Sequence, residues 1–290
     1  FEVLLEPVLT LFGLFWWFFG GIFEIYNHVP DSHFFFSCAI FITLSLFICE
    51  LLRKRFEWRL IGFPNYLLLP LLYLFLLLTI TQDYDHPLQK LGIIAWPLAI
   101  FHLYFVLKRF GSPIMHTAAL WLVTALFTWE VSWQIDQLAA DKINWVYLTW
   151  CLVPALVILL VTKLSTKITW PLKAHCKTYM TQGLGFIVIY CLGWAVFNHF
   201  LESGNVSPLP YLPILNPIDA VAIFTFFSIF TWLKQVNHHN YFNLQESNRD
   251  KSYIVIVFFV FLWVNAVLIR SIHQWFDVPF TSKALYDSLI

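Results

Sequence analysis

The sequence predicts an all-α, polytopic transmembrane helical bundle with about nine membrane-spanning helices. Three observations lead to this class: the composition, the length of the apolar segments and the alternation of basic loops. Of the 290 residues, 60% are hydrophobic, 20% are aromatic and 12% are charged. Soluble domains carry about 25% charged residues, so a soluble fold of this size could not cover its surface with polar side chains. Lipid is therefore the simpler solvent for this chain.

Nine apolar segments are long enough, or nearly so, to cross a bilayer as helices of about 20 residues. They lie near Val3–Tyr26, Phe34–Leu52, Asn65–Thr81, Leu91–Leu107, Ile114–Ile135, Trp145–Thr162, Gln182–Leu201, Pro217–Leu233 and Tyr253–Arg270. We expect residues 1–290 to form a single transmembrane helical domain. Because the chain starts at Phe1 inside an apolar run, we also expect it to be part of a longer membrane protein.

The lysines and arginines alternate between the two sides of these predicted helices. Most of the seventeen basic residues follow the second, fourth, sixth and eighth segments. They are Arg53, Lys54, Arg55, Arg59, Lys108, Arg109, Lys163, Lys167, Lys173, Lys177, Lys234, Arg249 and Lys251, whereas Lys90, Lys142, Arg270 and Lys283 fall on the other side. Basic loops face the cytoplasm in multi-pass proteins. We therefore predict a bacterial inner-membrane protein whose first residue is on the cytoplasmic side and whose last is on the periplasmic side.

Charge and cysteine content narrow the possible partners. Seventeen basic and seventeen acidic residues cancel, which gives no electrostatic case for nucleic-acid binding. The five cysteines form no CxxC pair, so we expect no disulfide framework, no metal site and no cofactor. The expected partners are membrane lipids, a lipid-linked or glycan substrate, and another membrane protein.

The last apolar segment ends in a polar face. Arg270, His273 and Gln274 are spaced i, i+3, i+4, so a helix places them on one side. An arginine inside a membrane costs about 2.5–3.5 kcal/mol at a helix centre and less near the headgroups. We therefore expect a partner or substrate to compensate Arg270 at the periplasmic boundary.

A second polar stripe lies on the fifth predicted helix. Glu130, Gln134 and Gln137 fall at i, i+4, i+7, which predicts a face toward the bundle interior or a wet cavity. The alternative is an interfacial belt of aromatic and polar anchors. A carboxylate inside a membrane helix needs a partner, and Arg270 is the obvious candidate for Glu130.

The stretch LPYLPILNPIDA (Leu209–Ala220) predicts a helix start. Asn216 is a suitable N-cap, Pro217 fits the first turn, and Asp219 lies where the helix dipole favours an anion. The alternative is a re-entrant loop that closes over the periplasmic site.

Two motifs resemble a known family. LPYLPILNPIDA, followed about 45 residues later by NAVLIRSIHQWFDVPF, resembles the bacterial multi-pass membrane family labelled domain of unknown function 2339. Trp96-Pro97, His102 and HTAALWLVTALFTWEVSW from His116 fit as well, so the resemblance spans roughly residues 96–290. Gln274 stands where many relatives are expected to have a second histidine. The family has no established activity, so the resemblance implies topology and candidate positions but no reaction.

Three functions are compatible with these residues. The first is an envelope-associated transferase acting on a lipid-linked or glycan substrate, with Arg270, His273, Glu130 and Asp219 as candidate catalytic residues. In it, Arg270 holds an anionic group, His273 acts as acid or base, and Glu130 or Asp219 orients or pairs. Candidate substrate-binding residues are Arg270, Gln274, Asn216 and Gln134. The second function is a transporter or flippase, which predicts polar residues through the whole bundle. The third is a non-catalytic membrane scaffold subunit, in which Arg270 is simply ion-paired.

Overall fold

The prediction of an all-α membrane bundle is confirmed by the computed structural model, which describes residues 2–82, 84–139, 143–205, 209–243, 245–276, 278 and 280. Over these residues, nine helical spans are long and apolar enough to cross a membrane. Helices suit this environment because every backbone polar group is satisfied within the segment. The chain divides into two compact units, Phe1–Leu126 and Phe127–Ile290, and each is described by itself. A single domain over residues 1–290 stays a prediction.

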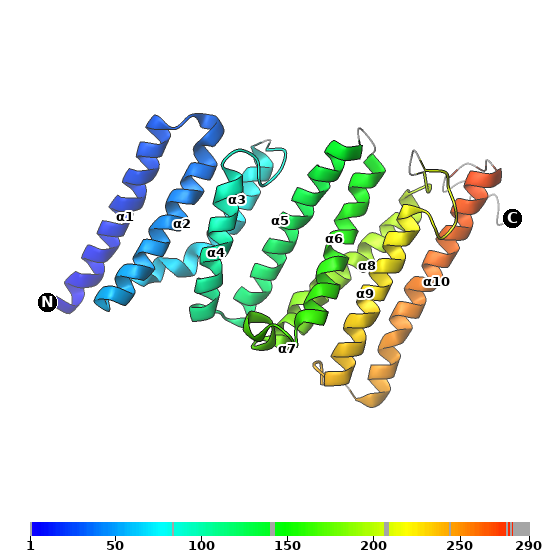
Figure 1. The fold of residues 1–290 in the computed structure, drawn as a ribbon. Coiled ribbons are helices and arrows are strands. Elements are labelled where there is room, and N and C mark those ends of the chain that lie inside the picture. The colour runs from blue at the N-terminus through cyan, green and yellow to red at the C-terminus, as the bar shows by residue number, and fades with distance from the viewer. Residues whose placement is uncertain are drawn as a thin grey trace. The chain divides into compact units, whose positions relative to one another are not determined.

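The first unit is built around its second helix (Figure 1). Its elements are α1 (Glu2–His28), α2 (Asp31–Phe56), the 3₁₀ segment η1 (Leu60–Leu67), α3 (Leu68–Thr81), α4 (Gly92–Phe110) and the first part of α5 (Pro113–Ala139). Helix α2 packs against α1, η1, α3 and α4. Leu46, Leu72 and Ala99 are each 1% exposed and form part of the core.

The third span begins earlier than the sequence predicts. The expected segment was Asn65–Thr81, whereas the helical span runs over Leu60–Thr81 and starts with η1. Pro64 lies inside η1 and lacks a backbone N–H, and it disfavours an α-helical residue before it. A regular α-helix therefore starts only at Leu68.

The second unit holds the remaining helices (Figure 1). They are the end of α5, α6 (Ile143–Leu164), the π-helical segment η2 (Thr169–Lys173), the three-residue α7 (Cys176–Thr178), the π-helical segment η3 (Tyr179–Gly183), α8 (Leu184–Leu201), α9 (Pro217–His239) and α10 (Glu246–Phe276). Helix α9 packs against α6, α8 and α10. It is therefore the central helix of this unit.

Small residues form the contact between α6 and α9. Cys151, Ala155 and Thr225 are fully buried, and Ala222 is 1% exposed. The Cys151 Sγ and Thr225 Oγ1 atoms lie 3.3 Å apart. Lipid supplies no hydrophobic force between membrane helices, so their association depends on close packing. Small side chains allow this close approach.

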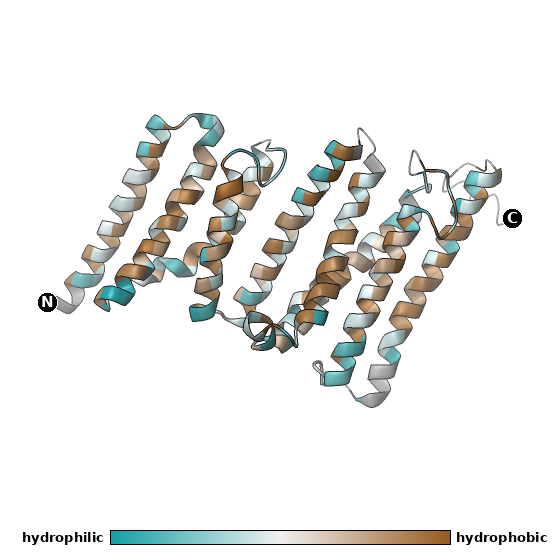
Figure 2. Cartoon of the chain, viewed as in Figure 1, coloured by the Kyte–Doolittle hydropathy of each residue, from teal (hydrophilic) through white to brown (hydrophobic). Residues whose placement is uncertain are grey.

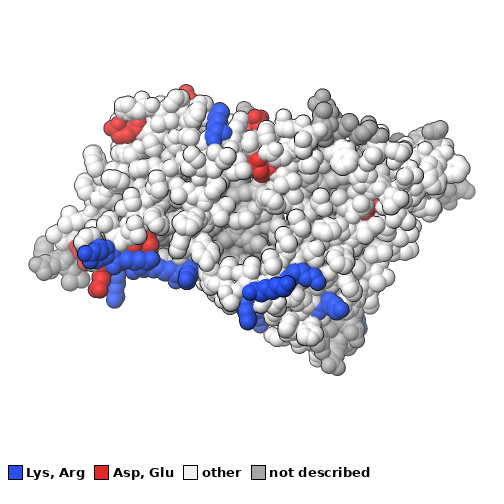
Figure 3. Space-filling model, viewed as in Figure 1, with Lys and Arg blue, Asp and Glu red and all other residues white. Residues whose placement is uncertain are grey.

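Polar residues lie at the ends of the helices in each unit. Figure 2 shows apolar residues along the middle of the helices and hydrophilic residues near their ends. Figure 3 shows most of the visible lysines and arginines along one end of each unit, with a smaller basic patch at the opposite end of the first unit. In the first unit these side chains come from the last turns of α2 and α4, which Arg109 and Glu50 join by an ion pair. Lys142 and Lys283 lie outside the described residues.

Candidate functional site

The start of α9 places the first residues of the candidate site. Asn216 has an extended backbone, and its Oδ1 accepts a hydrogen bond of 2.9 Å from Ile218 N. Pro217 occupies the first turn, where a missing N–H costs nothing. The predicted N-cap is confirmed, and it brings Asp219 to the buried side of the first turn, where it is 0% exposed.

The Asp219 carboxylate receives three donors. Arg270 Nη1 donates at 3.0 Å and Trp263 Nε1 at 3.2 Å, both to Oδ1. The backbone N–H of Ile214 donates to Oδ2 at 3.3 Å. Ile214 has φ of 70°, which is unusual for a β-branched residue, so this bond holds a strained backbone in place.

Every nitrogen of the Arg270 guanidinium donates to a protein oxygen. Besides Nη1, Nε donates to Glu202 O at 3.0 Å and Nη2 donates to Asn198 O at 2.9 Å. The side chain is 1% exposed and that of Asp219 is 0% exposed. The predicted compensation of the costly arginine is therefore provided by the protein itself, from α8, α9 and the segment between them.

The α8–α9 connection is fastened to α10 by further hydrogen bonds. Gln274 Nε2 donates to Ser203 O at 3.1 Å, and Tyr211 OH donates to Val267 O at 3.2 Å. A third bond ties the connection to the start of α9, since Asn216 Nδ2 donates to Gly204 O at 2.8 Å. We call the side chains of Arg270, Gln274, Asp219 and Asn216, together with the backbone of 202–204, the clasp.

Gly204 is required within the clasp. Its φ of +88° lies in the region that favours glycine. A Cβ at this position would lie 2.8 Å from Tyr211 Cε2 and 3.4 Å from Arg270 Cδ. A side chain here would be strained by the positive φ and would press against the Tyr211 ring, whereas its distance to Arg270 would be an ordinary contact.

His273 lies on the same face of α10, one turn beyond Arg270. Its Nδ1 contacts Val278 O, and its ring lies against Phe280 with centroids 5.5 Å apart. The half-buried imidazole therefore contacts Val278 and Phe280, the two described residues that follow α10. An acid or base role for His273 stays a prediction.

The predicted pairing of Glu130 with Arg270 is wrong, since the carboxylate that contacts the guanidinium is Asp219. Glu130 Oε1 instead accepts from Gln134 Nε2 at 2.9 Å on its own helix. Gln134 and Gln137 are exposed, which favours the interfacial belt over an interior stripe. The catalytic roles of Arg270, Asp219 and Glu130 and the substrate-binding roles of Gln274, Asn216 and Gln134 stay predictions.

Burial also changes the chemistry of the α8–α9 connection. It raises the pKa of the half-buried Glu202 carboxyl above its ordinary value, and the charge of Arg270 only partly opposes this rise. Desolvation disfavours the ionised form of a carboxyl group. Glu202 is thus easier to protonate than a free glutamate.

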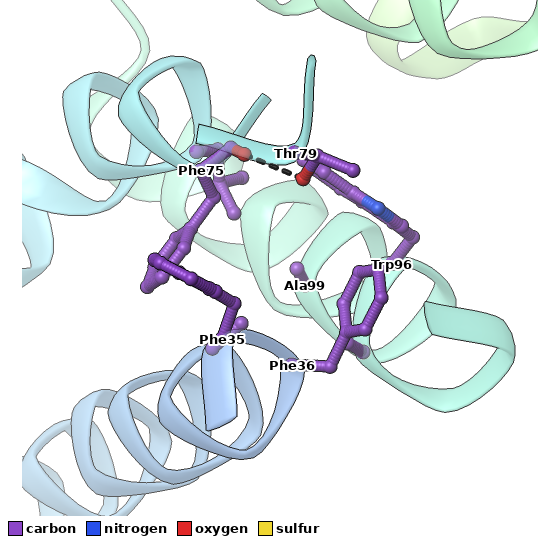
Figure 4. A pocket seen from close by; sticks show the side chains of 9 residues that line it. Phe35, Phe36, Phe75, Thr79, Trp96 and Ala99 are labelled. Carbon is purple, nitrogen blue, oxygen red and sulfur yellow. Dashed lines mark hydrogen bonds between the residues drawn. The ribbon is translucent and has the colours of Figure 1, made fainter. Parts of the chain in front are cut away.

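A small pocket in the first unit has little capacity for chemistry. It lies between α2, α3 and α4, with a volume of about 10 Å³. Figure 4 shows Phe36, Trp96 and Thr79 around it, and the Thr79 hydroxyl donates to Phe75 O at 2.6 Å. Space of this size holds a single water at most. Among the described residues, no three His, Cys, Asp or Glu side chains are placed to hold a metal ion.

Sequence reasoning missed two residues of the clasp region. Trp263 lies seven residues before Arg270, which places it on the same helix face, and this spacing could have identified it. Gly204 gives a weaker signal, since it is a glycine in the connection between two apolar segments. Its role depends on its positive φ and on the approach of the Tyr211 ring, which local sequence does not show.

Comparisons with known proteins agree with the geometry of a multi-pass membrane protein. No match was found among curated proteins, and none among solved structures. The model of a family described as "Predicted membrane protein (DUF2339)" matches residues 9–290. This match covers nearly the whole chain and includes every residue of the clasp. The chain therefore belongs to the DUF2339 family of membrane proteins.

Proposed function

We propose that the chain is a non-catalytic scaffold subunit of the bacterial inner membrane, and that the clasp is a structural fastening at its periplasmic end. The single observation that supports this proposal is the state of Arg270. All three of its nitrogens donate to protein oxygens, and the side chain is 1% exposed. A guanidinium in this state stabilises the fold and presents little surface to a ligand.

The two other hypotheses require more than these contacts supply. A transferase needs Arg270 to hold an anionic group of a substrate, but Asp219 already occupies that position at 3.0 Å. A transporter needs a polar path across the membrane. The described core of α6 and α9 is instead mostly apolar along the middle of both helices, and the buried Thr225 and Ser228 hydroxyls donate to carbonyls of their own helix.

The proposed orientation rests on the basic helix ends. In each unit most of the lysines and arginines lie at one end, which in multi-pass proteins faces the cytoplasm, whereas Lys90 and Arg270 fall on the other side (Figure 3). The clasp belongs to the α8–α9 connection, which the positive-inside rule assigns to the periplasm. Labelling intact cells with a membrane-impermeant maleimide tests this, using Asn205→Cys and Lys108→Cys in a background without Cys176. The orientation predicts labelling at position 205 alone, and labelling at position 108 alone would reverse it.

A conservative change at His273 separates scaffold from enzyme. Asparagine can place its Nδ2 near the position of the histidine Nδ1 and keep the contact with Val278 O, but it cannot act as an acid or base at neutral pH. We expect His273→Asn to restore the phenotype of a deletion strain, with wild-type envelope lipids and glycans. Loss of the phenotype while His273→Asn is present in the membrane at wild-type abundance would favour the transferase.

A second variant tests Arg270 in the same strain. Arg270→Met/Asp219→Asn removes both charges and keeps an acceptor for Trp263. Under the scaffold proposal, the extent to which this double variant restores the phenotype of the deletion strain follows the amount of folded protein in the membrane. Complete loss of the phenotype at normal abundance would show that the guanidinium does more than hold the fold.

A further inference from the structure

A groove between α1, α2 and η1 lies in the first unit, apart from the clasp. Its volume is about 250 Å³. It shares Leu9, Thr10 and Trp58 with a second hollow of about 420 Å³ that also contacts Leu5 and Glu6. The groove is lined by Leu9, Thr10, Gly13, Leu14, Trp17, Ser45, Ile48, Cys49, Leu52, Trp58 and Ile61.

The lining suits a hydrocarbon chain. The Thr10 hydroxyl donates to Glu6 O at 2.7 Å, so it needs no other acceptor. Trp17 Nε1 donates to Ser45 Oγ at 2.9 Å, which ties α1 to α2 and satisfies the indole. A Cβ at Gly13 would meet nothing within 4 Å, so the groove is open along this side of α1. An occupant therefore meets apolar surface rather than groups that need a polar partner.

Charges of both signs lie near Trp58, where the groove and the second hollow meet. Arg55 lies in the last turn of α2 and Arg59 directly precedes η1, so they lie on either side of Trp58 in the sequence, and both are exposed. The neighbouring Arg53 is already engaged, because its Nε and Nη2 donate to Glu50 at 2.9 Å. Lys54 Nζ lies 3.8 Å from the same carboxylate. Arg55 and Arg59 are thus the exposed arginines of this segment that can meet an external anion.

The negative charges near Trp58 come from Glu57, which directly precedes it and is exposed, and from Glu6. The exposed side chain of Glu6 lines the second hollow together with Trp58. Tryptophan is enriched at the headgroup level of membranes, which places this region at the boundary between hydrocarbon and headgroups. A ligand here meets an apolar groove, an indole, the exposed arginines Arg55 and Arg59, and the carboxylates of Glu6 and Glu57.

From this arrangement we infer that the groove binds a phospholipid with an amine headgroup, such as phosphatidylethanolamine. An acyl chain lies in the groove against Gly13 and Ile48. The phosphate interacts with Arg55 and Arg59, and the ammonium interacts with Glu6. A purely anionic headgroup would satisfy the arginines but would be repelled by Glu6. This site is independent of the scaffold proposal, because the clasp contributes no residue to it.

Native mass spectrometry of the detergent-solubilised full chain tests the groove with phosphatidylethanolamine as the probe. We expect the wild type to retain the lipid and Gly13→Leu to lower retention at least about tenfold, or 1.4 kcal/mol. Gly20→Leu is the matched control, since a Cβ at Gly20 also meets nothing within 4 Å and Gly20 does not line the groove. Equal retention by the two leucine variants would overturn the proposed position of the acyl chain.

The headgroup is tested by competition between phosphatidylethanolamine and phosphatidylglycerol. The wild type is expected to prefer the former, and Glu6→Gln is expected to remove the preference. Arg55→Gln/Arg59→Gln should weaken the retention of both lipids, whereas Lys90→Gln, a change of a cation in the α3–α4 connection, should leave both unchanged. A wild-type preference for phosphatidylglycerol, or equal effects of the arginine and lysine changes, would overturn the headgroup assignment.

Discussion

Replacing Arg270 by methionine removes the cation of the clasp and keeps most of the side-chain volume. Asp219 is then left as a buried carboxylate with two donors, Trp263 Nε1 and Ile214 N. Breaking a buried ion pair by removing one partner costs about 3–5 kcal/mol. The lost bonds to carbonyls add less, because Asn198 O keeps the N–H of Glu202 at 3.2 Å. We therefore expect Arg270→Met to lower the free energy of unfolding by about 3–5 kcal/mol.

Denaturant unfolding of the purified protein in mixed micelles measures this loss. Lys234→Met is the control, since Lys234 is an exposed cation in the same unit. Adding Asp219→Asn to Arg270→Met removes the unpaired charge, so it should recover about 1–3 kcal/mol. Equal losses for Arg270→Met and Lys234→Met, or no recovery in the double variant, would refute the ion pair as the main stabilising contact.

Three further predictions concern neighbouring groups. Glu202 has a raised pKa in the folded state, so its contribution to stability is greatest below its unfolded pKa, near 4.5, and is lost as pH rises through the folded value. Thermal unfolding of Glu202→Gln between pH 4 and 7 should therefore show a weaker decline than the wild type, and an unchanged slope would contradict the burial argument. Asn216→Ala removes the N-cap of α9 and should cost about 1–2 kcal/mol in denaturant unfolding, whereas Asn265→Ala, which loses one bond to its own helix, should cost less. Glu50→Gln removes the carboxylate that pairs with Arg53 and should lower the free energy of unfolding by about 3 kcal/mol in the same assay. An equal loss of stability for the exposed Glu57→Gln would contradict this prediction.

Much of the fold was predictable because lipid imposes simple rules. Apolar length sets the spans, and the nine predicted segments correspond to the nine spans of the described chain. The Asn216 cap was also predictable, since it depends on a few adjacent residues. The exact start of the third span was not, because Pro64 favours the tighter η1 before α3.

The partner of Arg270 illustrates the limit of sequence reasoning. Spacing along α10 identifies the face on which Arg270 lies, but it does not tell which helix packs against that face. Helix α10 packs against α8 and α9, so Asp219 was within reach. Glu130 had the stronger sequence argument, because a carboxylate inside a membrane helix needs a partner. Its partner Gln134, however, lies four residues away on the same helix.

The two charged residues of the clasp lie far apart in the sequence, and this distance affects how the helices are inserted during synthesis. Asp219 and Arg270 are 51 residues apart, and the carboxylate is synthesised first. At roughly 5–20 residues per second, α9 waits several seconds before its cation leaves the ribosome. We expect the nascent α9 to stay beside the insertion machinery until α10 arrives, so that the two helices enter the bilayer together. Crosslinking of chains stalled between α9 and α10 would detect this pause, and Asp219→Leu should shorten it.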